Sequence, residues 1–161
     1  MTSRDVRIRR ARPNDADAIA NVIASADPDV LVSEIDREER RERIRWLLET
    51  EQNIWFVAEL GGAVVGELGL ALQDPGPACL GLSVTPSKRR LGIAAALLAE
   101  ATRWAEEHDV HKIAADVFPE NDAALALLRK HGFQEEGHLK RHYRREHGEA
   151  RDAVVLGRLL V

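Results

Sequence analysis

The spacing of apolar residues changes along the chain, and each change predicts a new element. Val6 to Arg10 alternates apolar and basic residues, which is typical of a short edge strand. Asn14 is then placed to cap a helix, with Asp17 three residues later completing a capping box. A helix is therefore expected after the first strand, with its apolar stripe at Ile19, Val22, Ile23 and Ala26.

The middle of the chain predicts one charged helix followed by three strands. Glu34 to Thr50 is dense in charge and apolar on one narrow side, which favours a surface helix. Ile54 to Leu60 and Ala63 to Leu72 are expected strands, joined by a hairpin turn at Gly61-Gly62. Ala78 to Val84 is short and apolar, as expected for a central buried strand.

The second half predicts two more helices and three more strands. Gly92 to His108 has the clearest helical period, and Asn121 is placed to cap a helix that runs to His131. Gly132 and Phe133 then have the positions of a Schellman stop. The element order is β-α-α-β-β-β-α-β-α-β-β, in one domain over residues 1–161. The three strands are expected at Lys112 to Phe118, Leu139 to Tyr143 and Ala153 to Leu160, with a hairpin turn at Glu146 to Glu149 between the last two.

Composition narrows the class of protein. The net charge is -4, so bulk positive charge does not make the chain a nucleic-acid binder. Cys79 is the only cysteine, which excludes an internal disulfide and suits a reducing compartment. No apolar run follows the arginines near the N-terminus, and the run from Ile93 to Ala99 is too short to cross a bilayer. A cytoplasmic protein with no membrane partner is expected.

The stretch VTPSKRRLGIAAALL, residues 84–98, carries candidate chemistry. A strand leads into a helix through a short loop, so unpaired N–H groups and the positive end of the helix dipole face that loop. Gly92 lets a ligand approach the backbone closely, and Lys88, Arg89 and Arg90 add positive charge beside it. This helix start suits a pyrophosphate. It lacks the Gly-Lys-Ser/Thr ending of an NTPase loop and the G-x-G-x-x-G of a dinucleotide site.

Two motifs resemble those of the GNAT superfamily of N-acetyltransferases. The family's acetyl-CoA motif, Q/R-x-x-G-x-G/A, is matched by Arg89-x-x-Gly92-x-Ala94. A second family segment is matched by Asn121-x-x-Ala124-x-x-Leu127-Leu128-x-x-x-Gly132-Phe133. The final hairpin of small bacterial members is matched more weakly by His147-Gly148-Glu149-x-x-Asp152. The resemblance implies a GNAT-like α/β (α+β) fold, with one mixed, mostly antiparallel central sheet flanked by about four helices.

The resemblance also implies an activity and a binding site. Members transfer acetyl from acetyl-CoA directly to a primary amine of a small molecule or peptide, in a ternary complex and without an acyl-enzyme. The pyrophosphate is expected on backbone N–H groups of residues 89–95, and the pantetheine arm on the strand at 82–84, where it splays from the next strand. A homodimer is left open. The implied acetyl-CoA-binding residues are Leu82, Ser83, Val84, Arg89, Arg90, Leu91, Gly92, Ile93, Ala94, Ala95, Asn121, Ala124 and Leu128.

The general acid and base are harder to assign, because the chain departs from the family pattern. Leu128 stands where a tyrosine usually protonates the leaving thiolate. Tyr143, the only tyrosine, is one candidate acid; the alternative is unassisted departure, since a free thiol has a pKa of about 8.5. The fourth strand has no carboxylate, so the candidate bases are Glu67 on the preceding strand and Glu34 before the second helix, each acting through water. Otherwise Glu67 faces outward and Glu34 is a solvated charge.

Alternative interpretations remain open. The missing tyrosine leaves a non-catalytic acyl-CoA-binding module as one alternative, and a protein N-terminal or lysine acetyltransferase as another. Six histidines complete no recognisable ligand set, so no metal is expected. The basic run from Lys140 to Arg145 favours a solvated hairpin over RNA binding, and Cys79 has no neighbour to activate it as a nucleophile. The connection from Asp27 to Asp36 holds four carboxylates, which either attract a positively charged acceptor or only cap the second helix.

Overall fold

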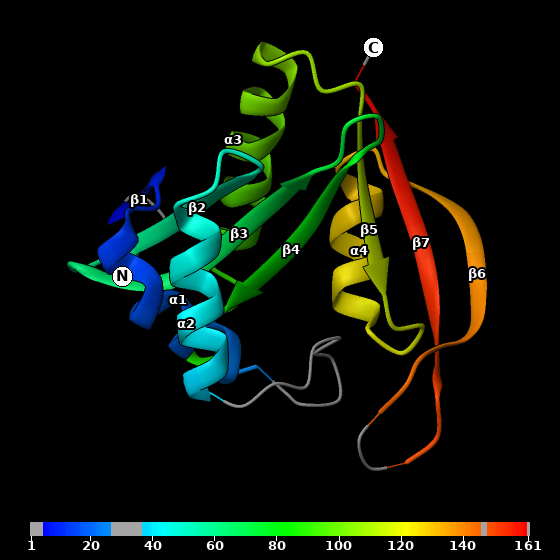
Figure 1. The fold of residues 1–161 in the computed structure, drawn as a ribbon, viewed down its shortest axis with the longest axis horizontal. Coiled ribbons are helices and arrows are strands. Elements are labelled where there is room, and N and C mark those ends of the chain that lie inside the picture. Colours follow the sequence, from blue (N-terminus) through cyan, green and yellow to red (C-terminus); the bar gives the residue numbers. More distant parts are fainter. Residues whose placement is uncertain (1–4, 27–36, 146–147, 161) are drawn as a thin grey trace.

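The computed structural model describes residues 5–26, 37–145 and 148–160. Its centre is one seven-stranded sheet in the order β1-β2-β3-β4-β5-β7-β6 (Figure 1). Only β4 and β5 pair in parallel among the described strands, so the predicted mixed, mostly antiparallel sheet is confirmed, as is the predicted element order. The elements are β1 (Val6–Arg10), η2 (Pro13–Asp15), α1 (Ala16–Ala24), α2 (Arg37–Leu48), β2 (Asn53–Leu60), β3 (Ala63–Leu72), β4 (Ala78–Val84), η3 (Pro86–Lys88), α3 (Ile93–Glu107), β5 (Lys112–Val117), α4 (Asp122–Lys130), β6 (Gln134–Tyr143) and β7 (Arg151–Leu159).

Helices cover both faces of the sheet. Successive residues of a strand point to opposite faces, so β2 sends Phe56 toward one cluster of apolar side chains and Val57 toward another. Val57 packs with α1 and α2, whereas Phe56 belongs to the larger cluster that contains Leu97 of α3 and Leu125 of α4. The core therefore has two parts, one on each side of the sheet.

Helix α4 shows the predicted local signals at both of its ends. The side chain of Asn121 accepts a hydrogen bond from the N–H of Ala124 at 3.2 Å and starts α4. Gly132 follows the helix with a φ of 85°, which is the left-handed region. The N–H of Phe133 then donates to the carbonyl of Leu128 at 3.0 Å, as in a Schellman motif. These start and stop predictions are confirmed.

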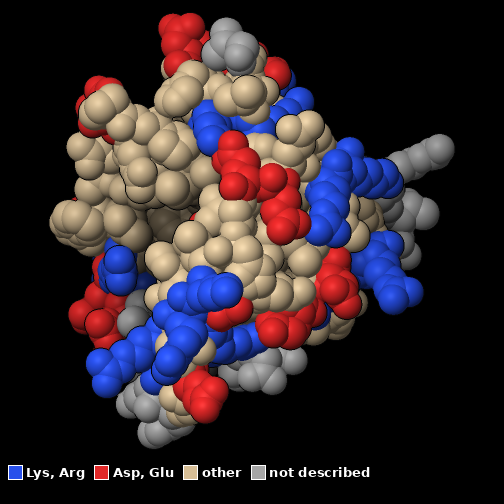
Figure 2. Space-filling model, turned by 90° about the vertical axis from the view of Figure 1, so that its right-hand side faces the viewer, with Lys and Arg blue, Asp and Glu red and all other residues tan. Residues whose placement is uncertain are grey.

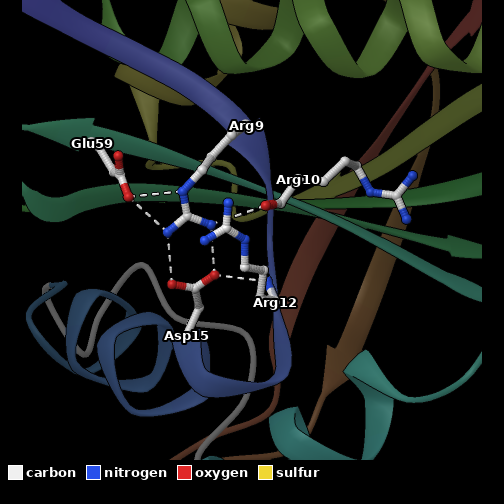
Figure 3. A network of polar contacts seen from close by, with 5 residues as sticks. All are labelled: Arg9, Arg10, Arg12, Asp15 and Glu59. Carbon is white, nitrogen blue, oxygen red and sulfur yellow. Dashed lines mark hydrogen bonds and ion pairs between the residues drawn. The ribbon is translucent and has the colours of Figure 1, made fainter.

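The predicted cap of the first helix is wrong. Asn14 lies inside η2, and α1 begins only after Asp15. The carboxylate of Asp15 accepts two bonds from the guanidinium of Arg9, at 2.7 and 2.9 Å, and one from the N–H of Arg12 at 2.7 Å (Figure 3). Arg9 also donates to Glu59 of β2 at 2.7 Å. Charge-assisted bidentate bonds are stronger than a neutral cap, so this network of β1, η2 and β2 sets where the helix begins.

Other boundaries also differ from the predictions. β6 begins at Gln134, before the predicted start at Leu139, because the first residues of this edge strand are exposed and show no apolar alternation. The acidic connection from Asp27 to Asp36, which includes Glu34, lies outside the described residues. So do two residues of the predicted turn between β6 and β7.

Candidate functional site

The strands β4 and β5 separate soon after they meet. Their parallel pairing joins Ala78 to Ile113 and Cys79 to Ala114, and no further pair between them occurs in these fully described strands. Figure 1 shows the two arrows diverging toward their C-terminal ends. One edge of β4 from Leu80 onward therefore has no partner strand, and its N–H and C=O groups are available to another molecule.

The loop after β4 leads to an open helix start. Gly92, the residue before α3, has a φ of 77°, and the first bond of the helix runs from the N–H of Ala96 to the carbonyl of Gly92 at 3.0 Å. Within the described chain, the N–H groups of Ile93, Ala94 and Ala95 have no backbone acceptor. A Cβ added at Gly92 would meet no atom within 4 Å, so the space beside the loop at this residue is open.

A pocket of about 500 Å³ lies where β4 and β5 separate. Its walls come from both helical layers and from the sheet, and reach from α1 and α2 to α4 and β6. Of the residues that the sequence assigned to acetyl-CoA binding, Leu82, Ser83, Asn121, Ala124 and Leu128 line this pocket. Val84 and residues 89–95 do not line it; they form the end of β4, the loop and the start of α3.

Glu67 is buried in the pocket wall and does not face outward. Glu67 is 2% exposed, and its Oε2 accepts a hydrogen bond from Nε1 of Trp55 at 2.7 Å. The hydroxyl of Ser83 donates a second bond. Burial raises the pKa of Glu67 to about 7, and the two hydrogen bonds offset part of that rise. A carboxyl group with such a pKa can accept and release a proton at neutral pH.

Tyr143 reaches the same pocket from β6. Its hydroxyl donates to Oδ2 of Asp116 at 2.5 Å, and its ring meets that of Phe118 edge-on. Partial burial, followed by the hydrogen bond to Asp116, raises the pKa of Tyr143, so the hydroxyl keeps its proton at neutral pH. Leu128, at the position where the resembling family carries a tyrosine, is buried and brings no polar side-chain atom to the pocket.

Comparison with known proteins assigns the family. The sequence model of the Acetyltransferase (GNAT) family matches residues 18–133. The chain belongs to the GNAT acetyltransferase family. No curated protein sequence matches it significantly.

Solved structures share the GNAT fold over nearly the whole chain. A GNAT-family acetyltransferase from Streptococcus pneumoniae is 25% identical with a TM-score of 0.80, covering 96% of this chain and 99% of that one. A ribosomal-protein-alanine N-acetyltransferase from Brucella melitensis is 26% identical with a TM-score of 0.80, covering 95% and 99%. An N-acetyltransferase from Staphylococcus aureus, at 21% identity, shows the same fold with a TM-score of 0.82 and covers 97% and 99%.

Three further residues line this GNAT pocket: two that were not predicted as site residues and one cysteine. Sequence reasoning missed Trp55 and Asp116, which hold Glu67 and Tyr143. No sequence signal placed Trp55, because the turn register alone would pair Phe56 with Glu67. The register shift between Ala58 and Glu59 brings Trp55 and Glu67 to one face of the hairpin. Cys79 also lines the pocket, but burial and then the charge of Asp116 raise the pKa of its thiol, which disfavours a nucleophilic role.

The surface around β6 and β7 carries both signs of charge. Lys112 pairs with Glu136, and His138 with Asp152. Figure 2, which looks at this side of the molecule, shows basic and acidic groups interspersed. In the described residues, no three His, Cys, Asp or Glu side chains are grouped to hold a metal ion. None of the described helices has the length and apolar character needed to cross a membrane.

Proposed function

We propose that this GNAT protein is an acetyl-CoA-dependent N-acetyltransferase that transfers acetyl directly to a primary amine in a ternary complex. One observation carries the proposal: a single pocket joins the unpaired edge of β4 to a carboxyl group that can accept a proton, Glu67, and to a hydroxyl group that holds one, Tyr143. Membership of an acetyltransferase family supports the reaction class.

The start of α3 and the unpaired edge of β4 suit acetyl-CoA. The free N–H groups at the start of α3, from Ile93 to Ala95, and the positive end of the helix dipole favour a pyrophosphate. The edge of β4 at 82–84 offers hydrogen bonds to the amide groups of a pantetheine arm. The side-chain oxygen of Asn121 accepts one bond from the N–H of Ala124, and its NH₂ group supplies two donors that can contact the cofactor.

The two titratable groups have complementary roles in this proposal. Bound acetyl-CoA supplies a thioester acetyl group, which becomes an amide of the amine while the thiol leaves. Glu67 takes the proton that the amine gives up, directly or through one water, and its pKa of about 7 suits that task. Tyr143 supplies the proton that the leaving sulfur accepts, for which its hydroxyl must turn from Asp116, to which it donates in this structure, toward the sulfur. Both groups then exchange protons with solvent.

Two alternatives keep some support. A protein N-terminus as acceptor is favoured by the likeness to the Brucella melitensis protein, which is named a ribosomal-protein-alanine N-acetyltransferase. A non-catalytic acyl-CoA-binding module is favoured by Leu128 at the usual tyrosine position. The placement of Glu67 and Tyr143 in one pocket favours catalysis over binding alone.

The test has a binding arm and a turnover arm. Calorimetry on Gly92→Glu is expected to show acetyl-CoA affinity at least about tenfold lower, or roughly 1.4 kcal/mol, because a side chain there blocks the N–H donors. Gly62→Glu is the matched control, since Gly62 has a φ of 80° and equally open surroundings. Release of free thiol from acetyl-CoA is then followed with a panel of amines. Unchanged affinity in a folded Gly92→Glu variant refutes the cofactor site, and binding without turnover favours the binding module.

A further inference from the structure

The sheet face under α1 and α2 forms a regular floor for the pocket. The strand register aligns Trp55 of β2, Gly69 of β3 and Gly81 of β4 in one row across three strands. Glu67 and Ser83 lie opposite each other in the neighbouring row and point to the same face. These five residues all line the pocket.

Trp55 and the two glycines give this floor an uneven shape. A Cβ added to Gly69 would lie 3.0 Å from Cε2 of Trp55, so the indole lies directly over Gly69. The bond from Nε1 to Glu67 fixes the ring in that place. A Cβ added to Gly81 would meet nothing within 4 Å. The row therefore presents a flat aromatic surface followed by an empty slot, with the carboxyl group of Glu67 beside both.

The charge of the lining selects among amines. Two carboxyl groups, of Glu67 and Asp116, line the pocket, and no Lys, Arg or His does so among the residues described. Ile23 of α1 and Leu47 of α2 face it from above the floor. An acceptor with a carboxylate would find no counter-ion here, and burying that unpaired charge is costly. An acceptor with an apolar body and a single positive amine fits both features.

We propose that the acceptor is a small primary amine with a flat apolar body and no carboxylate, such as an arylalkylamine. Its ring lies against Trp55, and its amino group reaches over Gly81 toward Glu67. This inference rests on the proposed N-acetyltransferase function and names the acceptor class for it. A small amine is favoured over a protein N-terminus because the lining beside Glu67 is one aromatic ring and one empty slot, which fit a short apolar body.

The first experiment compares acceptors that differ by one group. Rates of thiol release from acetyl-CoA are measured with phenethylamine and with phenylalanine, which share a ring and an amine but differ in the carboxylate. We expect kcat/KM for phenethylamine to exceed that for phenylalanine by at least about tenfold. Equal or faster reaction of phenylalanine overturns the inference. So does an alanine-initiated peptide that reacts faster than phenethylamine, which would point to a protein acceptor.

A second experiment fills the slot. Gly81→Val is expected to lower kcat/KM for phenethylamine at least about tenfold while calorimetry shows acetyl-CoA affinity changed by less than about threefold. Gly137→Val on β6 is the matched control, because a Cβ at this strand glycine also meets nothing within 4 Å. An unchanged rate in folded Gly81→Val overturns the acceptor position. Acetyl-CoA binding with no thiol release for any amine refutes the proposed function itself, which separates the two failures.

Discussion

Asp15 and Glu67 are both buried carboxyl groups, at 8% and 2% exposure, but their surroundings differ in one respect. Asp15 faces the guanidinium of Arg9 at two points (Figure 3). Glu67 receives only neutral donors, from Trp55 and Ser83. The bonds from Arg9 hold the pKa of Asp15 below its usual range despite burial, whereas burial raises the pKa of Glu67 to about 7.

The difference separates a structural role from a chemical one. A carboxylate locked by a cation stays ionised at neutral pH and joins elements, as Asp15 joins β1 to the start of α1. A carboxyl group without a cation costs stability when it ionises, and in return it can exchange a proton near pH 7. The position of the second group in the wall of a pocket is what makes that exchange useful.

The largest expected effect is on the rate of acetyl transfer and follows from a change at Glu67. Glu67→Gln keeps an oxygen for the N–H of Trp55 but removes the base, so the rate of acetyl transfer should fall roughly 10²–10⁴-fold. Initial rates of thiol release with the best amine measure it, across pH 6–9. The same change at the structural site, Asp15→Asn, should leave kcat within about threefold in folded protein. A Glu67→Gln variant with wild-type rate and pH profile contradicts the assignment of Glu67 as base.

The next largest effect is on the free energy of unfolding and follows from a change in the ion pairs of Asp15. Arg9→Met leaves Asp15 and Glu59 without their cation, so the free energy of unfolding should fall by roughly 3–5 kcal/mol at pH 7. Urea unfolding measures the loss, with the exposed Arg43→Met as control. The pKa of Asp15 is depressed in the folded state, so the network's contribution is present above the ordinary carboxyl pKa and is lost as pH falls through the folded value. A loss that does not shrink in acid would show that the charge of Asp15 is not its source.

Glu67 should show the opposite dependence on pH. Its folded pKa of about 7 exceeds the ordinary value of 4.5, so stability is full below the lower value and declines as pH rises through the higher one. Glu67→Gln removes the decline, and the variant should gain up to about 3 kcal/mol over wild type between pH 5 and pH 8. Urea unfolding at four pH values tests this, with the exposed Glu42→Gln as control. A gain that is constant across this range would place the pKa of Glu67 outside it.

The same contrast shows how far sequence reasoning reaches. Local signals predicted local structure: Asn121 starts α4, Gly132 ends it, and the turn at Gly61-Gly62 joins β2 to β3 as expected. The element order followed from hydrophobic period and from these breaks, because burial on one face imposes that period. The helix start after η2 was not predicted, because Asp15 receives two bonds from Arg9 of another element in addition to the one from the nearby N–H of Arg12.

The candidate site also has one part that the sequence predicted and one part that it did not. The loop before α3 could be predicted, since its glycine, cations and following alanines are contiguous in the sequence. The burial of Glu67 could not, because an acidic residue in a strand usually faces solvent. Its environment comes from the register that sets it opposite Ser83, from Trp55 on the preceding strand and from the helices above. Burial raises the pKa of Glu67, and the hydrogen bonds from Trp55 and Ser83 offset part of that rise, so its value depends on residues of three strands that no local pattern contains.

The smallest expected effect is a shift in the pH profile of kcat, caused by loss of the hydrogen bond from Trp55 to Glu67. Trp55→Phe keeps an aromatic ring over Gly69 but removes the N–H that donates to Glu67. That bond lowers the pKa of Glu67, so its loss should raise the pKa further, by about half a unit to one unit for a hydrogen bond of ordinary net strength. The acidic limb of the kcat profile, where kcat rises as Glu67 loses its proton, should move to higher pH by that amount, and kcat at pH 7 should fall about two- to fivefold while kcat at pH 9 changes little.

A purely structural role for Trp55 predicts a different result. Loss of packing alone would lower kcat by the same factor at every pH, whereas loss of the hydrogen bond moves the profile along the pH axis. Trp46→Phe serves as the control, because Trp46 is 63% exposed on α2 and should leave the profile unchanged. The amine ionises identically with every variant, so a shift between variants measured with one amine reports on the protein. A limb that stays in place or moves to lower pH would show that the indole N–H does not tune Glu67.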